Sequence, residues 1–192
     1  MNASTAKPKS PLLTPEQYEV FLRTRPEEER WQLIDGEAVM MPPPTLRHQM
    51  IGGNLFELLR SALRHSRPDL AVLYEAGLRI EGFPAFLPVP DMLVVEQPVG
   101  EGSYADRFYL TAEILSDSNT QEYMSLKVER YAEHPRNLYS LIISQQEIGI
   151  EIWSRASDWK GVVLRSPQDI LDLPELGLRC LAGDLYLGTP LA

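Results

Sequence analysis

Two acidic residues lie within or beside apolar runs that predict buried strands, where removing a carboxylate from water costs free energy. Asp91 follows Pro90 and opens the apolar run Met92–Val95, and Glu113 lies inside the run Leu110–Leu115. A carboxylate that leaves water needs a partner, so Glu113 is either on an open sheet face or buried beside a counter-charge. If the two acids meet on neighbouring strands, a cation must relieve their repulsion, and paired hard oxygen ligands favour Mg²⁺ or Mn²⁺ over zinc. Spacing alone leaves open that Asp91 caps the strand by accepting from a loop N–H.

Three further residues could take part in such chemistry, and each has a simpler structural explanation. Lys127 shares a predicted helix face with Tyr123 and Tyr131, where a surface lysine whose stem covers aromatic rings is the favoured interpretation. His48 lies on the apolar stripe of the longest predicted helix, so a core role is favoured over a ligand role. Glu37 follows a predicted turn, where an exposed acid is the favoured interpretation.

Composition narrows the class of protein. The chain has 192 residues, 44% hydrophobic and 23% charged, which is typical of one globular domain and excludes disorder of the bulk. The net charge of −9 argues against a general electrostatic hold on nucleic acid or on an anionic membrane, although Arg60, Arg64 and Arg67 form a local basic cluster. A single cysteine, Cys180, excludes a disulfide framework and a cysteine zinc site. Without a signal core or a long apolar run, we expect a cytoplasmic protein with no membrane partner.

Periodicity predicts one domain at residues 13–192 behind a loose tail at 1–12. Thr14-Pro15-Glu16-Gln17 has the pattern of a capped helix start, and Asp35-Gly36 is a strong hairpin turn. Gly52 and Gly53 inside a helix cost about 1 kcal/mol each relative to Ala, a cost that close packing of another element would offset most simply. The predicted elements are a helix from residue 14 that ends at Pro26, a hairpin at 31–41, a helix at 45–65, strands at 71–80, 91–95 and 109–115, a helix at 121–133, and strands at 138–143, 148–152 and 159–165. This order predicts an α/β (α+β) fold with a mixed central sheet flanked by helices.

Six short motifs occur in the order that is seen in a known family. They are Ile34-Asp35-Gly36-Glu37, Arg47-His48-Gln49-Met50-Ile51, Asn54-Leu55, Pro90-Asp91, Glu113-Ile114-Leu115-Ser116-Asp117-Ser118 and Lys127 with Tyr131. With them the chain resembles the Uma-two family, a large bacterial family described as restriction endonucleases by fold analogy. The likeness runs from about Thr14 to Leu187. It implies a restriction-endonuclease-like fold of the PD-(D/E)XK type.

The resemblance also implies a catalytic centre. Asp91 and Glu113 would be the metal-binding acids, with Mg²⁺ or alternatively Mn²⁺ polarising a DNA phosphodiester. The lysine that usually stands two residues after the glutamate is here Leu115, so Lys127 would supply the ammonium group from the following helix. It would orient the attacking water or stabilise the developing negative charge.

Other residues enter the predicted site through the same resemblance. Glu37 would be an additional acid, and His48 would face the pocket. Arg47 and Tyr131 would contact the substrate. The implied partner is DNA, and cutting both strands favours a homodimer.

The sequence departs from the family pattern beside this centre. Ser116-Asp117-Ser118-Asn119 stands where the family usually has Ser-Pro-Ser-Thr, and Tyr123 and Ser125 replace a usual aspartate and glycine. Two alternatives to the nuclease therefore stay open. One is a catalytically inactive binding or assembly module that keeps the fold, and the other is a metal-dependent hydrolase of a different phosphate ester.

Overall fold

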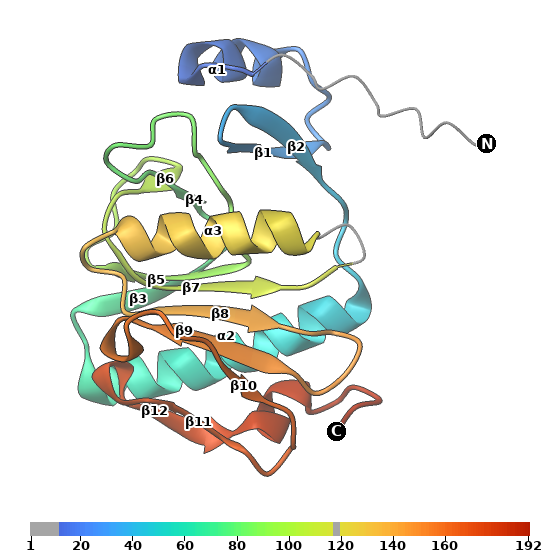
Figure 1. Cartoon of the computed structure of the whole chain (residues 1–192), viewed down its shortest axis with the longest axis vertical. Coiled ribbons are helices and arrows are strands. Elements are labelled where there is room, and N and C mark those ends of the chain that lie inside the picture. Colours follow the sequence, from blue (N-terminus) through green and yellow to red (C-terminus); the bar gives the residue numbers. More distant parts are fainter. Residues whose placement is uncertain (1–11, 117–119) are drawn as a thin grey trace.

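A mixed six-stranded sheet forms the centre of the protein (Figure 1). The structure is a computed structural model that describes residues 12–116 and 120–192, so the predicted tail up to residue 11 and residues 117–119 lie outside it. The strand order is β10-β9-β8-β7-β5-β3, in which β7 and β8 are parallel and all other neighbours are antiparallel. The strands are β3 (Leu70–Tyr74), β5 (Met92–Glu96), β7 (Phe108–Ile114), β8 (Tyr139–Ile143), β9 (Ile150–Ser154) and β10 (Val162–Leu164). The predicted fold class is confirmed.

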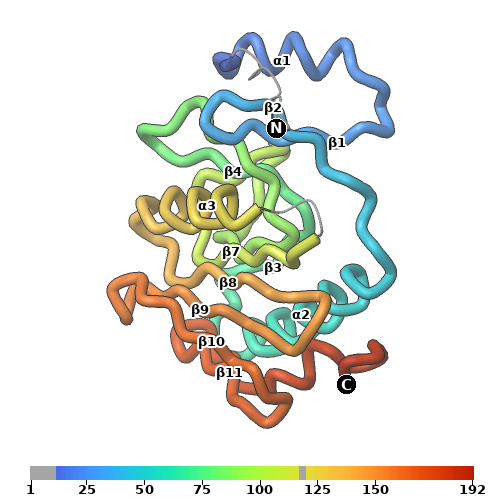
Figure 2. The backbone as a smooth tube through the Cα atoms, turned by 45° about the vertical axis from the view of Figure 1, so that its right-hand side comes forward, coloured from blue at the N-terminus to red at the C-terminus, as the bar shows by residue number. Residues whose placement is uncertain are grey.

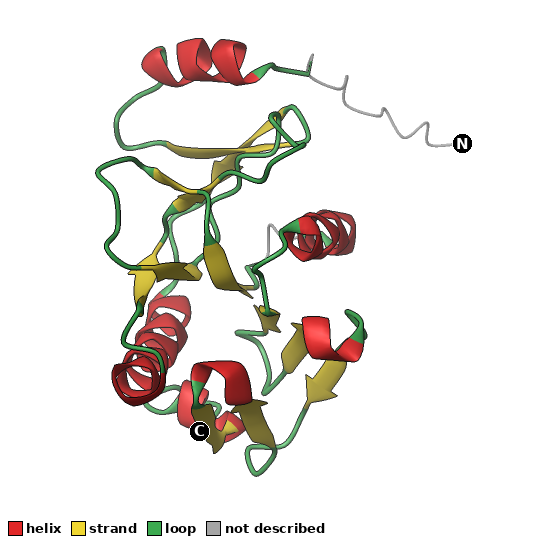
Figure 3. Cartoon of the chain, turned by 90° about the vertical axis from the view of Figure 1, so that its left-hand side faces the viewer, coloured by secondary structure: helices red, strands yellow, loops and turns green. Residues whose placement is uncertain are grey.

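Two helices cover opposite faces of this sheet (Figures 1 and 3). Their bounds are α2 (Leu46–Ser66) and α3 (Gln121–Glu133). Leu110 and Ala112 of β7 pack with Leu55 and Leu59 of α2 in the main core. Because side chains alternate along a strand, Glu113 points to the opposite face, toward α3. The strand pattern therefore aims one acid of the predicted pair at the helix that carries Lys127.

A helix and a hairpin form an N-terminal layer beside the sheet (Figure 2). Helix α1 (Pro15–Arg23) has the predicted capping box, in which Thr14 and Gln17 satisfy each other's backbone N–H groups. Strands β1 (Arg30–Ile34) and β2 (Glu37–Met41) form the predicted hairpin. Its turn places Asp35 at φ 45° and Gly36 at φ 88°, the left-handed conformations that such a turn requires. Leu33 joins this layer to the main body through a bridge with Leu87.

The predicted strand at 71–80 is wrong in its extent. The chain leaves the central sheet after Tyr74, because Glu75 adopts φ 46° and breaks the extended backbone. Beyond that break, β4 (Gly77–Leu78) pairs in parallel with β6 (Tyr104–Ala105), a short strand that lies between the strands predicted at 91–95 and 109–115. The break matters for function because it lets Glu75 turn toward the pocket described below.

The close approach predicted for the glycine pair is confirmed at Gly52. A Cβ there would lie 3.3 Å from the Tyr74 hydroxyl oxygen and 3.4 Å from Cδ1 of Ile114. Helix α2 therefore lies directly against the end of β3.

The C-terminal part adds a small hairpin over the α2 side of the sheet. It consists of β11 (Ile170–Leu173) and β12 (Leu178–Leu181), followed by a short 3₁₀ turn, Ala182–Tyr186. Leu171, Leu185 and Tyr186 join the main core. Within the described ranges, no helix is both long enough and apolar enough to span a membrane.

Candidate active site

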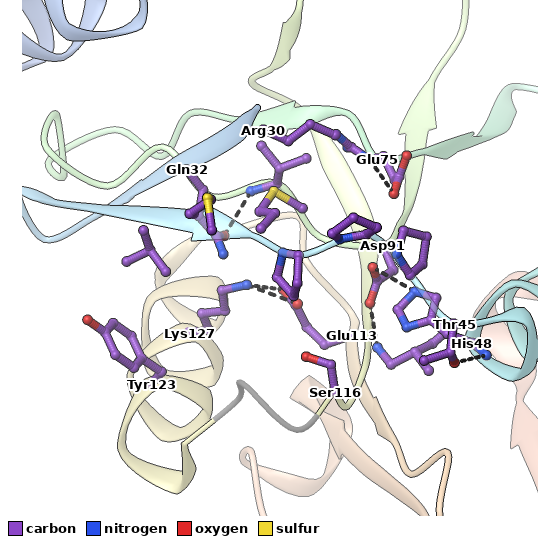
Figure 4. Close-up of a pocket in the computed structure, with 18 residues that line it drawn as sticks. Arg30, Gln32, Thr45, His48, Glu75, Asp91, Glu113, Ser116, Tyr123 and Lys127 are labelled. Atoms are coloured by element: carbon purple, nitrogen blue, oxygen red, sulfur yellow. Dashed lines mark hydrogen bonds and ion pairs between the residues drawn. The ribbon is translucent and has the colours of Figure 1, made fainter. Parts of the chain in front are cut away.

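One pocket lies where the hairpin, the start of α2 and the ends of β5 and β7 meet (Figure 4). Its volume is about 120 Å³, enough for an ion with a few waters or for one phosphate group. The predicted residues Asp91, Glu113, Lys127 and His48 all line it. They come from separate segments, so the fold assembles the site from distant parts of the chain.

The sheet register explains why the two acids meet. Strands β5 and β7 are antiparallel, and Met92 is paired with Ala112. Asp91 directly precedes Met92 and Glu113 directly follows Ala112, so this register brings both acids to the same end of the sheet. The negative charge of Asp91 adds to the effect of burial in raising the pKa of Glu113. The two carboxylates are thus electrostatic neighbours.

Glu113 forms a buried ion pair with Lys127. The Lys127 Nζ donates to Oε1 at 3.0 Å and to Oε2 at 2.9 Å, and the two side chains are only 4% and 7% exposed for Lys127 and Glu113 respectively. The Tyr131 hydroxyl also donates to Oε1, at 2.7 Å. Burial raises the pKa of Glu113, while the ammonium charge of Lys127 opposes that rise. Lys127 is therefore not the surface residue that local pattern favoured.

Asp91 connects α2 to β7. Its Oδ1 lies 3.1 Å from Nε2 of His48, and its Oδ2 accepts the backbone N–H of Ile114 at 2.6 Å. Burial acts to lower the pKa of His48, but the hydrogen bond and the charge of Asp91 outweigh it, so that pKa is raised. Asp91 thus both caps a backbone N–H, on a neighbouring strand rather than in a loop, and lines the pocket.

A third ion pair at the pocket was missed by sequence reasoning. Arg30 of β1 contacts Glu75 at 2.6 Å, and both residues line the cavity. The Glu75 backbone N–H also donates to the carbonyl oxygen of Asp91. Glu75 lies inside the predicted strand at 71–80. Only its positive φ, which the sequence does not show, distinguishes it from the strand residues before it. Figure 4 shows the three pairs, Arg30–Glu75, Lys127–Glu113 and His48–Asp91, around one pocket.

Three predicted site residues lie at the edge of this arrangement or outside it. Glu37 is exposed and accepts a hydrogen bond from Tyr123, whose pKa burial and that bond raise to about 12. Arg47 donates to the carbonyl oxygen of Gln145 and does not line the pocket. Tyr131 is fully buried behind Glu113, which does not fit the predicted contact with substrate and gives it a supporting position instead.

The donor set bears on the predicted metal. In the part of the chain that the structure describes, no three His, Cys, Asp or Glu side chains gather closely enough to hold an ion by themselves. Counting contacts with the described residues, three of the four carboxylate oxygens of Asp91 and Glu113 contact one hydrogen-bonding group each, and Glu113 Oε1 accepts two hydrogen bonds. An ionised carboxylate oxygen can accept about two hydrogen bonds, so lone pairs remain on both acids. Two carboxylates completed by waters and a phosphate are an ordinary Mg²⁺ environment.

Comparison with known proteins places the chain in a family. The family Uma2, described as "Putative restriction endonuclease", matches residues 15–182. The chain belongs to the Uma2 family. Among solved structures it is similar to a protein from Anabaena variabilis described as "a putative nuclease belonging to DUF820", with a TM-score of 0.72 and 20% sequence identity over 91% of this chain and 97% of that one. At that identity the likeness supports the nuclease-like fold alone. A comparison with functionally curated proteins gave no match.

Proposed function

We propose that this Uma2 protein is a Mg²⁺-dependent endonuclease that hydrolyses DNA phosphodiester bonds, with Mn²⁺ as an alternative metal. The observation that carries the proposal is that Asp91, Glu113 and Lys127 line one small pocket, although they are far apart in the sequence. Family membership and the nuclease-like fold support DNA as the substrate. Two hard carboxylates beside an ammonium group suit phosphoryl chemistry better than acyl or redox chemistry.

Asp91 and Glu113 would hold the metal through their remaining lone pairs. When bound, Mg²⁺ would polarise the scissile phosphate and lower the pKa of the attacking water. Asp91 is fixed for this role by the N–H of Ile114 and by His48, and Glu113 by Tyr131. Neither carboxylate has to be reoriented before an ion arrives, which favours binding because little order is lost.

Lys127 would act on the reacting phosphate. Contacts with the described residues use two of its three N–H donors, both toward Glu113, and the third would contact a phosphate oxygen or the attacking water. In a pocket that excludes most water, such a contact stabilises developing negative charge more than it would in solvent. Arg30 is a second cation in the pocket, and a phosphate that competes for it would have to displace Glu75.

The direct test is DNA cleavage under controlled metal conditions. Supercoiled plasmid is incubated with the protein in Mg²⁺, in Mn²⁺ or in EDTA, and nicked and linear products are separated on a gel. We expect cleavage with either metal, none in EDTA, and loss of activity by at least about a hundredfold in Asp91→Asn and Glu113→Gln. Asp172→Asn is the matched control, because Asp172 is an acid on β11 that pairs with Arg179 away from the pocket.

Lys127→Ala separates catalysis from metal binding. We expect it to lower turnover while the Mg²⁺ affinity, measured by calorimetry, stays nearly unchanged. Equal loss of metal affinity would show that the lysine holds the site together rather than acting on substrate. Cleavage that continues in EDTA would exclude the metal mechanism. Circular dichroism must show a native spectrum for each variant that is compared.

One observation favours a second candidate function, an inactive binding or assembly module. Each acid of the pocket has its own base, so the site is charge-balanced by its own side chains. A module of this kind would bind no divalent ion, and Asp91→Asn and Glu113→Gln would change neither metal affinity nor any activity. The same calorimetric titration therefore decides between the two functions.

A homodimer remains part of the proposal. One pocket per chain can cut one strand at a time, so a double-strand break at one position would take two copies. Sedimentation equilibrium, with and without duplex DNA, tests this. A monomer in both conditions would restrict the activity to nicking.

A further inference from the structure

A second concave surface lies between α2 and the edge strand β3 of the sheet. Strand β3 is the last strand of the central sheet, so one side of its backbone has no strand partner in the part of the chain that the structure describes. The groove between β3 and α2 has a volume of about 550 Å³. Its walls include Phe56, Arg60 and Arg64 from the helix, and Ala71 and Val72 from the strand. We refer to it as the β3 groove.

Two arginines give the β3 groove a positive charge, and the guanidinium of one, Arg60, lies over the Phe56 ring at 5.9 Å from its centroid. Arg60 and Arg64 are one helical turn apart, and both are exposed. Among the described residues, no carboxylate lies within ion-pair distance of either, whereas the neighbouring Arg67 is held by Asp69. The chain as a whole has a net charge of −9, but these two cations lie together on one surface. They are suited to hold an anionic ligand.

Tyr74 links the groove to the pocket. Its ring stacks on Phe56 of the groove, with ring centroids 5.1 Å apart, and the next residue, Glu75, lines the pocket. The closeness of Gly52 to the Tyr74 hydroxyl lets the ring lie against α2. Even so, Tyr74 is 44% exposed. The Tyr74 ring is thus fixed in position by its packing and remains partly exposed to solvent.

We infer that the β3 groove holds one strand of DNA as it passes toward the pocket, with Arg60 and Arg64 on backbone phosphates and Tyr74 under an unpaired base. Tyr74 contacts Phe56 of the groove and directly precedes Glu75 of the pocket, so an aromatic ring connects the pocket to the wall that carries the two cations, and this combination suits a strand that alternates bases and phosphates. Single-stranded nucleic acid is generally bound by such a combination of aromatic rings and a basic track. The small pocket agrees, because its volume admits one phosphate rather than a duplex. This inference rests on the proposed function for the choice of DNA.

Binding is tested without cleavage, so that failure of one proposal is distinguishable from failure of the other. Fluorescence anisotropy of a labelled single-stranded oligonucleotide is measured in EDTA over a range of salt concentrations. For the double variant Arg60→Ala/Arg64→Ala we expect affinity to fall by about tenfold or more at low salt. Two lost phosphate contacts should also reduce the slope of log K against log salt by about 1.4.

Matched variants assign the effect to this surface. Arg23→Ala/Arg165→Ala removes the same charge from exposed arginines outside the groove and should retain the wild-type slope. Tyr74→Leu should weaken single-strand binding by roughly fivefold or more, while Tyr74→Phe keeps the ring and should restore it. The same oligonucleotide annealed into a duplex should bind more weakly and respond little to Tyr74→Leu.

Different results would reject different parts of the proposal. No single-strand binding by the wild type, or equal losses in the two arginine pairs, overturns the β3 groove. A duplex that binds as tightly and is equally sensitive to Tyr74→Leu overturns its preference for one strand. Groove-dependent binding by a protein that never cleaves DNA would leave the groove standing and reject the nuclease.

Discussion

The ammonium group of Lys127 contacts both carboxylate oxygens of Glu113, at 3.0 and 2.9 Å, across an interior that excludes most water. Placing two charges out of water is costly, and their attraction offsets that cost only while both are present. Removing one partner therefore leaves an uncompensated buried charge. The pair that the proposed chemistry needs is also a point where the fold is vulnerable.

A double-mutant cycle on this pair should show strong coupling. Glu113→Gln and Lys127→Met should each lower the free energy of unfolding by about 3–5 kcal/mol, because each leaves the charge of the other residue buried and unpaired. The double variant should cost much less than the sum of the two. Urea denaturation in EDTA measures all four proteins. Single variants within about 0.5 kcal/mol of the wild type would mean that solvent reaches the pair.

The Lys127→Met variant should also become less stable as pH rises. Burial already raises the pKa of Glu113, and losing the ammonium group raises it further. A group whose folded pKa lies above its unfolded pKa stabilises the protein below the unfolded value, and this contribution is lost as pH rises through the folded value. The cost of the substitution should therefore be smaller at about pH 5 than at about pH 8.

His48 should give the wild type a stability component of its own that depends on pH. Asp91 outweighs burial and raises the pKa of His48, with further contributions from the charges of Glu75 and Glu113. This stabilisation is full below the unfolded histidine pKa of about 6.5 and disappears as pH rises through the folded value. In EDTA, the stability difference between the wild type and His48→Gln should thus shrink from about pH 6 to about pH 8.

The exposed residue His65 provides the control for this experiment. It lies near the end of α2, and its Nδ1 contacts the carbonyl oxygen of Ser61 rather than a carboxylate. His65→Gln should have little effect at either pH. A stability difference for His48→Gln that stays constant with pH would mean that His48 is neutral beside Asp91.

Local sequence signals predicted the elements that depend on a few neighbouring residues. The capping box at Thr14 and the turn at Asp35-Gly36 need only side chains and backbone angles within about four residues, and both are confirmed. The strand at 71–80 failed because a positive φ at Glu75, a non-glycine residue, is set by its surroundings. Composition cannot reveal such an angle, so the Arg30–Glu75 pair could not be foreseen.

The candidate site was likewise predictable from the sequence only in part. The sequence suggested only that Asp91 and Glu113 could meet on neighbouring strands, and the register that brings them to the same end of the sheet comes from the structure. The burial of Lys127 could not be predicted from the sequence, because a helix face with one lysine and two tyrosines, Tyr123 and Tyr131, is typical of a solvent-exposed surface. Only the packing of α3 on β7 turns that face inward. The family resemblance supplied the lysine where local reasoning favoured a surface position.

Tyr131 and Tyr123 should respond differently to loss of the hydroxyl group. Tyr131 donates to a buried carboxylate, and a hydrogen bond to a charged group contributes about 1.5–3 kcal/mol, so Tyr131→Phe should lower the free energy of unfolding by that amount. Tyr123 reaches the exposed Glu37, so Tyr123→Phe should cost less than about 1 kcal/mol. Thermal and urea denaturation measure both. Equal costs would contradict the supporting position assigned to Tyr131.

The two adjacent glycines of α2 make a matched pair for the β3 groove. At Gly53 the nearest atom to an added methyl group would be the Tyr74 hydroxyl oxygen at 4.0 Å, so Gly53→Ala should stabilise the protein by about 0.5–1 kcal/mol through helix propensity. At Gly52 the same atom lies at 3.3 Å, so Tyr74 must move and the gain should be reduced or reversed. Because the ring of Tyr74 would then no longer pack in its present position against α2, Gly52→Ala should also weaken single-strand DNA binding, while Gly53→Ala should not. Denaturation and anisotropy on the same two proteins test both effects, and equal behaviour of the variants would show that the helix does not position Tyr74.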